Sequence, residues 1–272
     1  MKAITNKESP KVLFLMMDFE DEPWSSLFEK GCKETWIREA NAKVLRYRGR
    51  KTIRSVSKKL NKLQISRFGL KLWPKSHIAY EISKKYSKLV TETDSIIMVD
   101  VPDNWWRHGQ KFLLALRYCI ENFDFEYLIK CNATLYVNTR QLTDFLILEK
   151  PMYAGPIEKK KTFASGWGTV LHRDICKILI NSDHKFFAKF FDDEALGLTL
   201  GKSGIHVTSM PLLWIKSLDD LRCSDPSLLA RYPFIRTKGY DVLGSRIDAQ
   251  IMIQLHEALK YDQKTKRVRT RR

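Results

Sequence analysis

The hydrophobic pattern alternates between short apolar runs and longer stretches with helical spacing. The apolar runs predict strands at residues 11–17, 43–47, 95–99, 127–130, 135–137, 153–155 and 205–208. The longer stretches predict helices at residues 26–40, 52–65, 76–89, 108–122, 140–149, 173–181 and 247–259. Ser26 and Glu29 form a capping-box pattern, which predicts that the first helix begins at Ser26. Because strands alternate with helices, we expect a mostly parallel sheet with helices on both faces.

The length and composition are those of one globular domain. The chain has 272 residues, of which 44% are hydrophobic and 29% charged, and this balance excludes a disordered or coiled-coil protein. It contains no internal repeat and no linker rich in glycine, proline or serine. We expect one domain over residues 1–262 and a basic tail over residues 263–272.

Hydropathy and cysteine usage indicate a cytoplasmic protein. The apolar run at residues 12–17 is much shorter than the roughly 20 residues that span a bilayer, and it lacks the cleavage site of a signal peptide. The five cysteines are odd in number, scattered and without a C-x-x-C pair. This pattern favours reduced thiols over a disulfide framework or a zinc site.

The positive charge is concentrated in two segments. The net charge is +17, residues 40–80 contain twelve Lys or Arg and no acid, and residues 264–272 contain six more. This placement is compatible with a solvated helix face, but it favours a polyanion: nucleic-acid phosphates or anionic lipid headgroups. The candidate nucleic-acid-binding residues are Arg46, Arg48, Arg50, Lys51, Arg54, Lys58, Lys59 and Lys62.

Four stretches carry the most distinctive chemistry, at residues 94–111, 123–138, 165–174 and 192–197. In order and spacing they resemble the galactosyltransferase/Fringe-like family of inverting glycosyltransferases, which have the GT-A fold. The matching positions are Asp94, Asp100, Asp103, Lys111, Lys130, Val137, Asn138, the Gly166–Gly168 element and the acidic element that begins at Asp192. The resemblance implies a single α/β domain of GT-A type that uses a nucleotide sugar.

The chain departs from that family where the resemblance places a metal site. Asn132, Ala133 and Thr134 replace three acids that would hold a divalent cation on the sugar-nucleotide diphosphate. Hard cations prefer carboxylate oxygens, so a metal cofactor is doubtful. Either lysine or arginine side chains such as Lys111, Arg107 or Lys130 stabilise the leaving diphosphate, or a metal binds elsewhere, or catalysis is lost.

The resemblance also implies roles for individual residues. Asp193 would be the catalytic base, although an acid in the first turn of a helix is also favoured by the helix dipole. Trp167 would offer a stacking face between two glycines, or pack in the core. The donor-binding residues would be Asp103, Trp105, Lys111, Lys130, Asn132, Thr134, Gly166, Trp167 and Gly168.

Charge and resemblance together predict the acceptor. The leading hypothesis is transfer of a hexose, such as glucose from UDP-glucose, onto modified DNA, either onto hydroxymethylcytosine or onto a sugar already attached to it, as in bacteriophages. The first alternative is a peripheral-membrane glycosyltransferase of surface polysaccharide or lipopolysaccharide synthesis. The second is an inactive glycosyltransferase-like module that binds nucleic acid.

Overall fold

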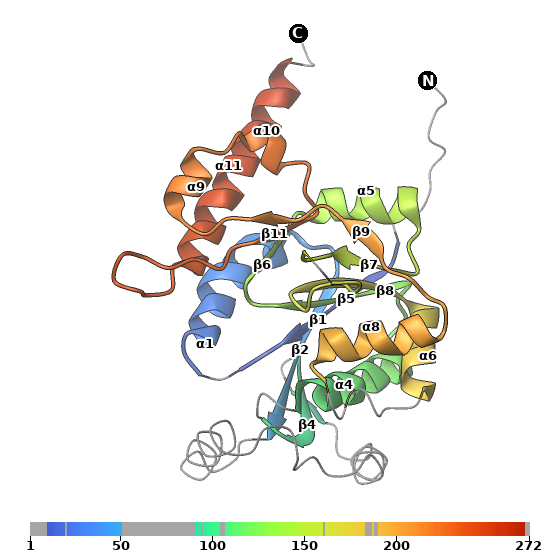
Figure 1. The fold of residues 1–272 in the computed structure, drawn as a ribbon. Helices are drawn as coiled ribbons and strands as arrows, with labels where there is room; N and C mark the ends of the chain where they lie inside the picture. Colours follow the sequence, from blue (N-terminus) through green and yellow to red (C-terminus); the bar gives the residue numbers. More distant parts are fainter. Residues whose placement is uncertain are drawn as a thin grey trace. The chain divides into compact units, whose positions relative to one another are not determined.

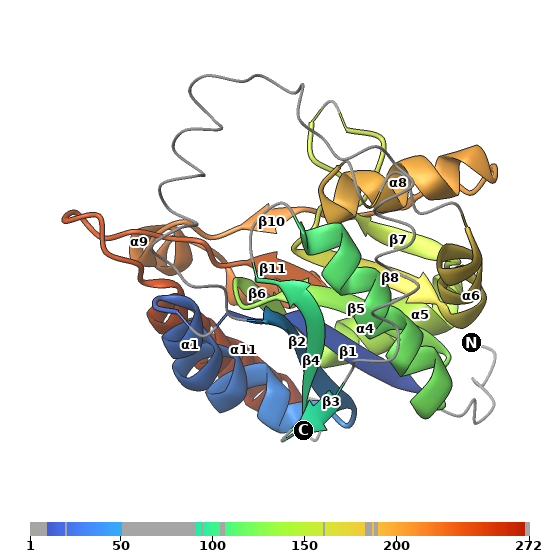
Figure 2. The same ribbon diagram turned by 90° about the horizontal axis from the view of Figure 1, so that it is seen from below.

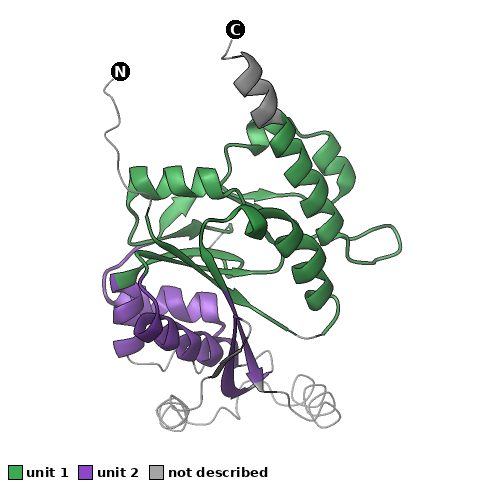
Figure 3. Cartoon of the chain, turned by 180° about the vertical axis from the view of Figure 1, so that it is seen from behind, with its two compact units in different colours: residues 1–44, 125–173, 207–272 green, residues 45–124, 174–206 purple. Residues whose placement is uncertain are grey.

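A computed structural model of the chain describes residues 10–19, 21–50, 91–93, 95–103, 107–159, 161–182, 187 and 190–269. The chain divides into two compact units (Figure 3). Unit 1 comprises residues 1–44, 125–173 and 207–272, and unit 2 comprises residues 45–124 and 174–206. The predicted helices at residues 52–65 and 76–89 lie outside the described residues.

Unit 1 is built on a mostly parallel run of strands. Its order is β1 (Val12–Met17), β5 (Tyr127–Asn132), β8 (Gly168–His172), β7 (Tyr153–Pro156) and β9 (Thr208–Met210). β1 is parallel to β5, and β7 is parallel to β9. β8 is antiparallel to both β5 and β7, so it alone runs against the other four strands of this run. The predicted α/β class with a mostly parallel sheet is confirmed.

A second, smaller sheet in unit 1 has the order β10 (Leu213–Trp214), β11 (Phe234–Arg236) and β6 (Leu135–Val137). β11 pairs antiparallel with β6, and Arg236 lies opposite Leu135. Two short helices, α9 (Leu218–Arg222) and α10 (Pro226–Leu229), separate β10 from β11 along the chain.

The main helices of unit 1 are α5 (Thr139–Glu149), α11 (Asp248–Arg269), and α1 (Trp24–Ser26) continued by the π-helix η1 (Leu27–Ile37). The segment containing α1 and η1 lies beside α11 (Figures 1 and 2). The predicted helix start at Ser26 is wrong. Ser26 already has helical φ and ψ angles, because the turn that follows Pro23 begins the helix at Trp24.

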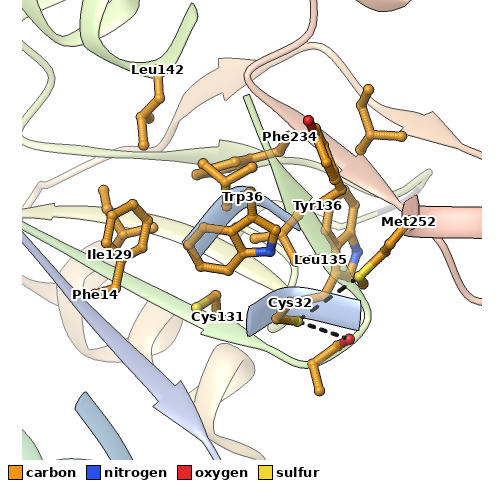
Figure 4. Packing of buried hydrophobic residues seen from close by; sticks show 14 of the residues in the cluster. Phe14, Cys32, Trp36, Ile129, Cys131, Leu135, Tyr136, Leu142, Phe234 and Met252 are labelled. Atoms are coloured by element: carbon orange, nitrogen blue, oxygen red, sulfur yellow. Dashed lines mark hydrogen bonds between the residues drawn. The ribbon is translucent and has the colours of Figure 1, made fainter. Parts of the chain in front are cut away.

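The core of unit 1 forms on the face of the strands that carries Phe14 and Ile129 (Figure 4). Alternate strand residues point to the same face, so these two side chains belong to the same buried cluster as the helical residues Trp36 and Met252. The ring centroids of Phe14 and Trp36 are 5.1 Å apart. Aromatic packing between β1 and η1 therefore fixes the helix against the strands.

Unit 2 contains the order β3 (Thr91–Thr93), β4 (Ile96–Pro102) and β2 (Lys43–Arg50), the last of which begins in unit 1. β2 is parallel to β4, and β3 is antiparallel to β4. The helices are α4 (His108–Asn122), α6 (Arg173–Asn181, of which Arg173 belongs to unit 1) and α8 (Asp192–Lys202). α4 packs against β4 and α8.

Four of the five cysteines are buried, namely Cys32, Cys119, Cys131 and Cys176, and all five are free thiols. Burial raises the pKa of the Cys32 thiol to about 12, which keeps it protonated and weakly nucleophilic. Cys223 is the exposed cysteine and follows α9. Among the described residues, no helix combines the length and apolar character that crossing a membrane requires.

Candidate functional site

A tight turn connects β5 to β6 at Asn132, Ala133 and Thr134. The Asn132 Oδ1 accepts hydrogen bonds from the Thr134 backbone N–H at 3.0 Å and from its hydroxyl at 2.8 Å. The Thr134 carbonyl accepts from the Thr237 N–H at 2.9 Å and from the Thr237 hydroxyl at 3.1 Å. These bonds hold the turn rigidly and join it to the residue that follows β11.

The side chains of this turn do not fit a divalent cation. Ala133 provides no ligand atom, and the Asn132 Oδ1 is already occupied by two donors from Thr134. Across the described ranges no group of three or more His, Cys, Asp or Glu residues could hold a metal ion. The turn therefore offers neutral oxygens where a hard cation prefers carboxylates.

Lys130 joins the turn to the glycine-rich segment that precedes β8. Its side chain is 1% exposed, and its Nζ donates a hydrogen bond to the Gly166 carbonyl at 3.2 Å. The β5–β8 register places Cys131 opposite Gly168. A Cβ added to Gly168 would meet the Phe234 ring at 3.0 Å, so a larger residue there would require that ring to move slightly.

A cluster of four side chains, Arg236, Glu158, Trp167 and Trp214, lies in the same unit and was not predicted. We call it the Arg236 cluster. The Arg236 guanidinium carbon is 4.5 Å from the ring centroid of Trp214 and 5.6 Å from that of Trp167. Its Nη1 donates to Glu158 Oε1 at 3.3 Å, and the Trp167 indole N–H donates to the same oxygen at 3.4 Å. Two aromatic faces and one carboxylate thus hold the guanidinium.

Burial and neighbouring charges act in opposite directions on the pKa values of Glu158 and Arg236, the two ionised members of this cluster. Partial burial raises the pKa of Glu158, but hydrogen bonds and charge from Lys161, then from Ser165 and Trp167, outweigh it and lower the pKa overall. Burial lowers the pKa of Arg236, and Glu158 opposes that change. Both groups are charged at neutral pH, so the cluster contains a fixed ion pair.

The two tryptophans of the Arg236 cluster differ in exposure. Trp167 is 2% exposed, and its ring is part of the core of unit 1. Trp214 is 39% exposed, and Lys216 places its ammonium 4.7 Å from the Trp214 ring centroid. The ring available to a ligand in this cluster is therefore that of Trp214.

Unit 2 contains the remaining described residues of the predicted donor site. The Lys111 ammonium is fully buried and forms an ion pair with Asp103. Arg107 donates to the Gln110 side chain at 2.9 Å. Trp105 lies outside the described residues.

Asp193, the predicted base, lies in the first turn of α8 beside Asp192 and Glu194. Its backbone N–H donates to the Asp192 carboxylate at 3.1 Å, and its own carboxylate accepts from the Glu194 N–H at 3.0 Å. Asp193 is partly exposed, whereas Asp192 is 5% exposed. Its partly exposed carboxylate thus lies where the helix dipole favours an anion.

The predicted nucleic-acid-binding residues are described only in part. Arg46 and Arg48 are partly exposed and lie on one face of β2, because the alternate residues Leu45 and Tyr47 are buried on the other face. The backbone of Arg50 ends β2. Lys51, Arg54, Lys58, Lys59 and Lys62 lie outside the described residues. The basic tail as far as Arg269 is the last part of α11.

No protein-family model and no curated protein sequence matches the chain. Several solved structures have a backbone fold similar to that of this chain. A mannosyltransferase from Pyrobaculum calidifontis, in complex with GDP-Man and Mn²⁺, is 10% identical over 75% of this chain, with a TM-score of 0.43. This chain spans 55% of that protein's length.

Two further structures have comparable scores. A glycosyltransferase involved in glycosylation of the major capsid of PBCV-1 is 9% identical, covers 90% of this chain and 98% of its own, and has a TM-score of 0.42. The glycosyltransferase GlyE of Streptococcus pneumoniae is 8% identical over 91% of this chain and 60% of its own, also with a TM-score of 0.42.

The Arg236 cluster had a weak signal in the sequence. Residues 214–216 read Trp-Ile-Lys, and residues 236–238 read Arg-Thr-Lys, so at the end of each short strand two large or charged residues flank a buried small or apolar one. Two- and three-residue strands are too short for this alternation to be recognised. The contact between Arg236 and Trp214 depends on pairing across the 21 residues that lie between them in the chain.

Proposed function

We propose that the protein is an inverting glycosyltransferase of GT-A type that transfers a hexose from a nucleotide sugar, such as UDP-glucose, to modified DNA. The observation that carries the proposal is the set of four stretches that resemble the galactosyltransferase/Fringe-like family in the same order. The structure supports it within unit 1, where Lys130, the Asn132–Thr134 turn and the Gly166–Gly168 segment are neighbours.

In this proposal, the unit 1 residues bind the donor. The turn at Asn132 and Thr134 and the backbone near Gly166 provide polar groups for the nucleotide sugar. Arg236 directly precedes Thr237, which bonds to the Thr134 carbonyl, and so holds its guanidinium, paired with Glu158, close to the turn. Such a charge stabilises the leaving diphosphate without a metal.

Asp193 acts as the base. The acceptor hydroxyl oxygen attacks the anomeric carbon, and the bond from that carbon to the diphosphate oxygen breaks. The hydroxyl proton passes to the Asp193 carboxylate, and the nucleoside diphosphate leaves as the anion. One attack from the face opposite the leaving group inverts the configuration at that carbon.

The acceptor is inferred from charge. Two acid-free segments carry eighteen Lys or Arg in a chain of net charge +17, and they would follow the phosphates of a duplex. A substituent on pyrimidine C5 projects into the major groove, where an enzyme can reach its hydroxyl. We expect the affinity for DNA to fall by about 10³-fold or more between about 50 mM and about 200 mM salt.

A transfer assay tests the proposal. Purified protein is incubated with a panel of UDP-sugars and with unmodified, hydroxymethylated or glucosylated DNA, and the digested nucleosides are weighed by mass spectrometry. A hexose increment on a modified nucleoside supports the proposal, and unmodified DNA is the matched control. UDP release without an increment, stimulated by anionic vesicles, would instead indicate a membrane glycan acceptor. DNA binding without any UDP release would indicate an inactive binding module.

A further inference from the structure

Arg246 connects two segments of unit 1 that are far apart in the sequence. It lies in the loop between β11 and α11, where it forms an antiparallel bridge with Tyr240. Its guanidinium carbon is 5.4 Å from the ring centroid of Tyr240 and 5.0 Å from that of Trp24, the first residue of α1. The loop before α11 and the start of α1 lie on the same side of unit 1 (Figures 1 and 2). One side chain therefore links the two.

The Arg246 guanidinium is held in one orientation. Its Nε and Nη2 donate to the two carboxylate oxygens of Asp248 at 2.5 and 2.8 Å. Asp248 is the first residue of α11 and is fully buried, and the Arg246 side chain is only 12% exposed. A bidentate pair fixes the plane of a guanidinium, which a lysine ammonium cannot reproduce. The Trp24 ring therefore packs against a rigid planar cation.

The segment that Arg246 contacts starts beside the proposed donor site. In the parallel register of β1 and β5, Met17 at the end of β1 lies opposite Asn132 at the end of β5. The chain that follows β1 is described at residues 18, 19 and 21–23, which we call the β1 loop, and it leads to Trp24. This loop leaves the sheet at the same edge as the Asn132–Thr134 turn. Open parallel sheets bind ligands outside this edge, at the carboxyl ends of their strands.

Contacts within this segment connect Trp24 to the start of the β1 loop. The ring centroids of Phe19 and Trp24 are 5.8 Å apart. The Trp24 N–H donates to the Asp21 carbonyl at 2.9 Å, which closes the turn before α1. Phe19 is only two residues from Met17. A contact that fixes the Trp24 ring therefore also restricts the part of the loop that is nearest to the Asn132 turn.

We infer that Arg246 is a positioning residue for donor binding: by stacking on Trp24, it holds the β1 loop in the conformation that accepts the nucleotide sugar. Without this contact the loop would have to be ordered when the donor binds, and the entropy cost would lower the affinity. Arg246 acts through Trp24 and before the chemical step, so its loss should raise the KM for the donor and leave kcat nearly unchanged. The inference rests on the proposed function.

Arg173 provides a matched control at the opposite end of β5. Its guanidinium carbon is 4.8 Å from the ring centroid of Phe125, and its Nη1 donates to the Phe125 carbonyl at 3.4 Å. Phe125 comes two residues before the first residue of β5, whereas Asn132 is the last residue of that strand. Arg173→Lys and Arg246→Lys therefore remove the same kind of planar contact at the two ends of one strand.

The experiment compares donor affinity with stability in these two variants. Titration calorimetry measures the Kd for UDP-glucose and for a panel of other nucleotide sugars, and thermal denaturation measures the melting temperature. For the sugar nucleotide that the wild type binds best, we expect Arg246→Lys to raise the Kd about fivefold or more and Arg173→Lys to change it by less than about 1.5-fold. Both variants should lower the melting temperature to a similar extent. A merely structural role would not separate their affinities in this way.

A double variant tests whether Arg246 acts through Trp24. Trp24→Leu should raise the Kd as much as Arg246→Lys, and the double variant should raise it no further, because both substitutions remove one contact. With a DNA acceptor, Arg246→Lys should raise the KM for the donor and keep kcat within about twofold of the wild-type value.

The outcomes distinguish this inference from the proposed function. An unchanged Kd in Arg246→Lys, an equal increase in Arg173→Lys, or multiplied effects in the double variant overturns the positioning role and leaves the proposed function intact. Donor binding that depends on Arg246, without transfer to DNA, supports the positioning role and overturns the DNA acceptor. If the wild type binds no nucleotide sugar, both proposals are wrong.

Discussion

The Arg236 guanidinium stacks on the ring of Trp214, with its central carbon 4.5 Å from the ring centroid, and its side chain is 17% exposed. The same group bonds to Glu158, which also accepts the Trp167 indole N–H. One cation therefore connects a partly exposed ring to a buried one.

Substitution of Arg236 should cost both stability and donor binding. Arg236→Lys retains the charge but loses the planar stacking, and we expect it to lower the unfolding free energy by about 1 kcal/mol. Urea denaturation measures this change, and the KM for the nucleotide sugar should rise at least severalfold. Arg222→Lys is the control, since that arginine forms an exposed pair with Asp219 and should change stability by less than about 0.5 kcal/mol. Equal behaviour of both variants would show that the stacking contributes nothing.

His256 should make stability depend on pH. It lines a small cavity of about 170 Å³, and the Tyr136 hydroxyl is 2.9 Å from its Nδ1 and Glu39 is 3.5 Å from its Nε2. Burial lowers the pKa of His256 below 6.5, Glu39 opposes this, and Lys260 adds to it. Because the folded pKa is the lower one, the stabilisation is present above about pH 6.5 and is lost as the pH falls through the folded value.

Denaturation measured from about pH 7.5 to about pH 5 tests this sign. We expect the unfolding free energy of His256→Gln to fall less than that of the wild type as the pH decreases. Glutamine can still accept from the Tyr136 hydroxyl, but it does not titrate. The charged groups that face this histidine include Glu257 and Arg38 in addition to Glu39 and Lys260. His206→Gln, at an exposed position, should leave the pH profile unchanged. If the unfolding free energy of His256→Gln falls with pH as much as that of the wild type, the prediction is wrong.

Transfer should not depend on a divalent cation bound at the Asn132 turn. We expect EDTA to change the rate by less than about twofold, because the turn offers neutral oxygens that are already hydrogen-bonded. Asn132→Asp keeps the acceptor for Thr134 but adds a negative charge beside the proposed diphosphate, and should slow transfer about tenfold or more in EDTA. If EDTA abolishes wild-type activity and Mn²⁺ restores it, a metal site exists elsewhere in the chain.

Asp193→Asn should remove the base without disturbing the helix. The amide oxygen can still accept from the Glu194 N–H, so we expect an unchanged melting temperature and a kcat lowered by about 10²-fold or more. Glu194→Gln changes the same helical turn and should lower kcat by less than about threefold. Retention of activity in Asp193→Asn would falsify its role as the base.

Most elements that bury a strongly periodic face were predicted from the sequence. The helices at His108–Asn122 and Arg173–Asn181 have the predicted bounds, because their apolar residues recur at helical spacing between clear polar boundaries. β6 at Leu135–Val137 also has its predicted bounds. β1 and β5 differ from prediction by one or two residues at one end.

The elements that sequence patterns missed are short or irregular. β8 lies within a glycine-rich stretch, and β10 and β11 are too short to show alternation. The strand predicted at residues 205–208 is wrong, since β9 occupies Thr208–Met210 and the preceding residues are irregular. α8 was not among the predicted helices, because its apolar residues are interrupted by Gly197 and Gly201, although a helix start was considered as the alternative role of Asp193. The Arg236 cluster forms only through pairing of β10 with β11, which local sequence does not encode.

Because four of the five thiols are buried and one is exposed, the natural sequence offers a single site at which a thiol-reactive dye can be attached. Cys223 follows α9 in unit 1 and is the exposed member of the five cysteines, while the Cys32 thiol remains protonated near neutral pH because burial raises its pKa. A maleimide dye added to the folded wild-type protein should therefore label one position. Fluorescence from that dye would report the approach of a labelled duplex without any engineered cysteine.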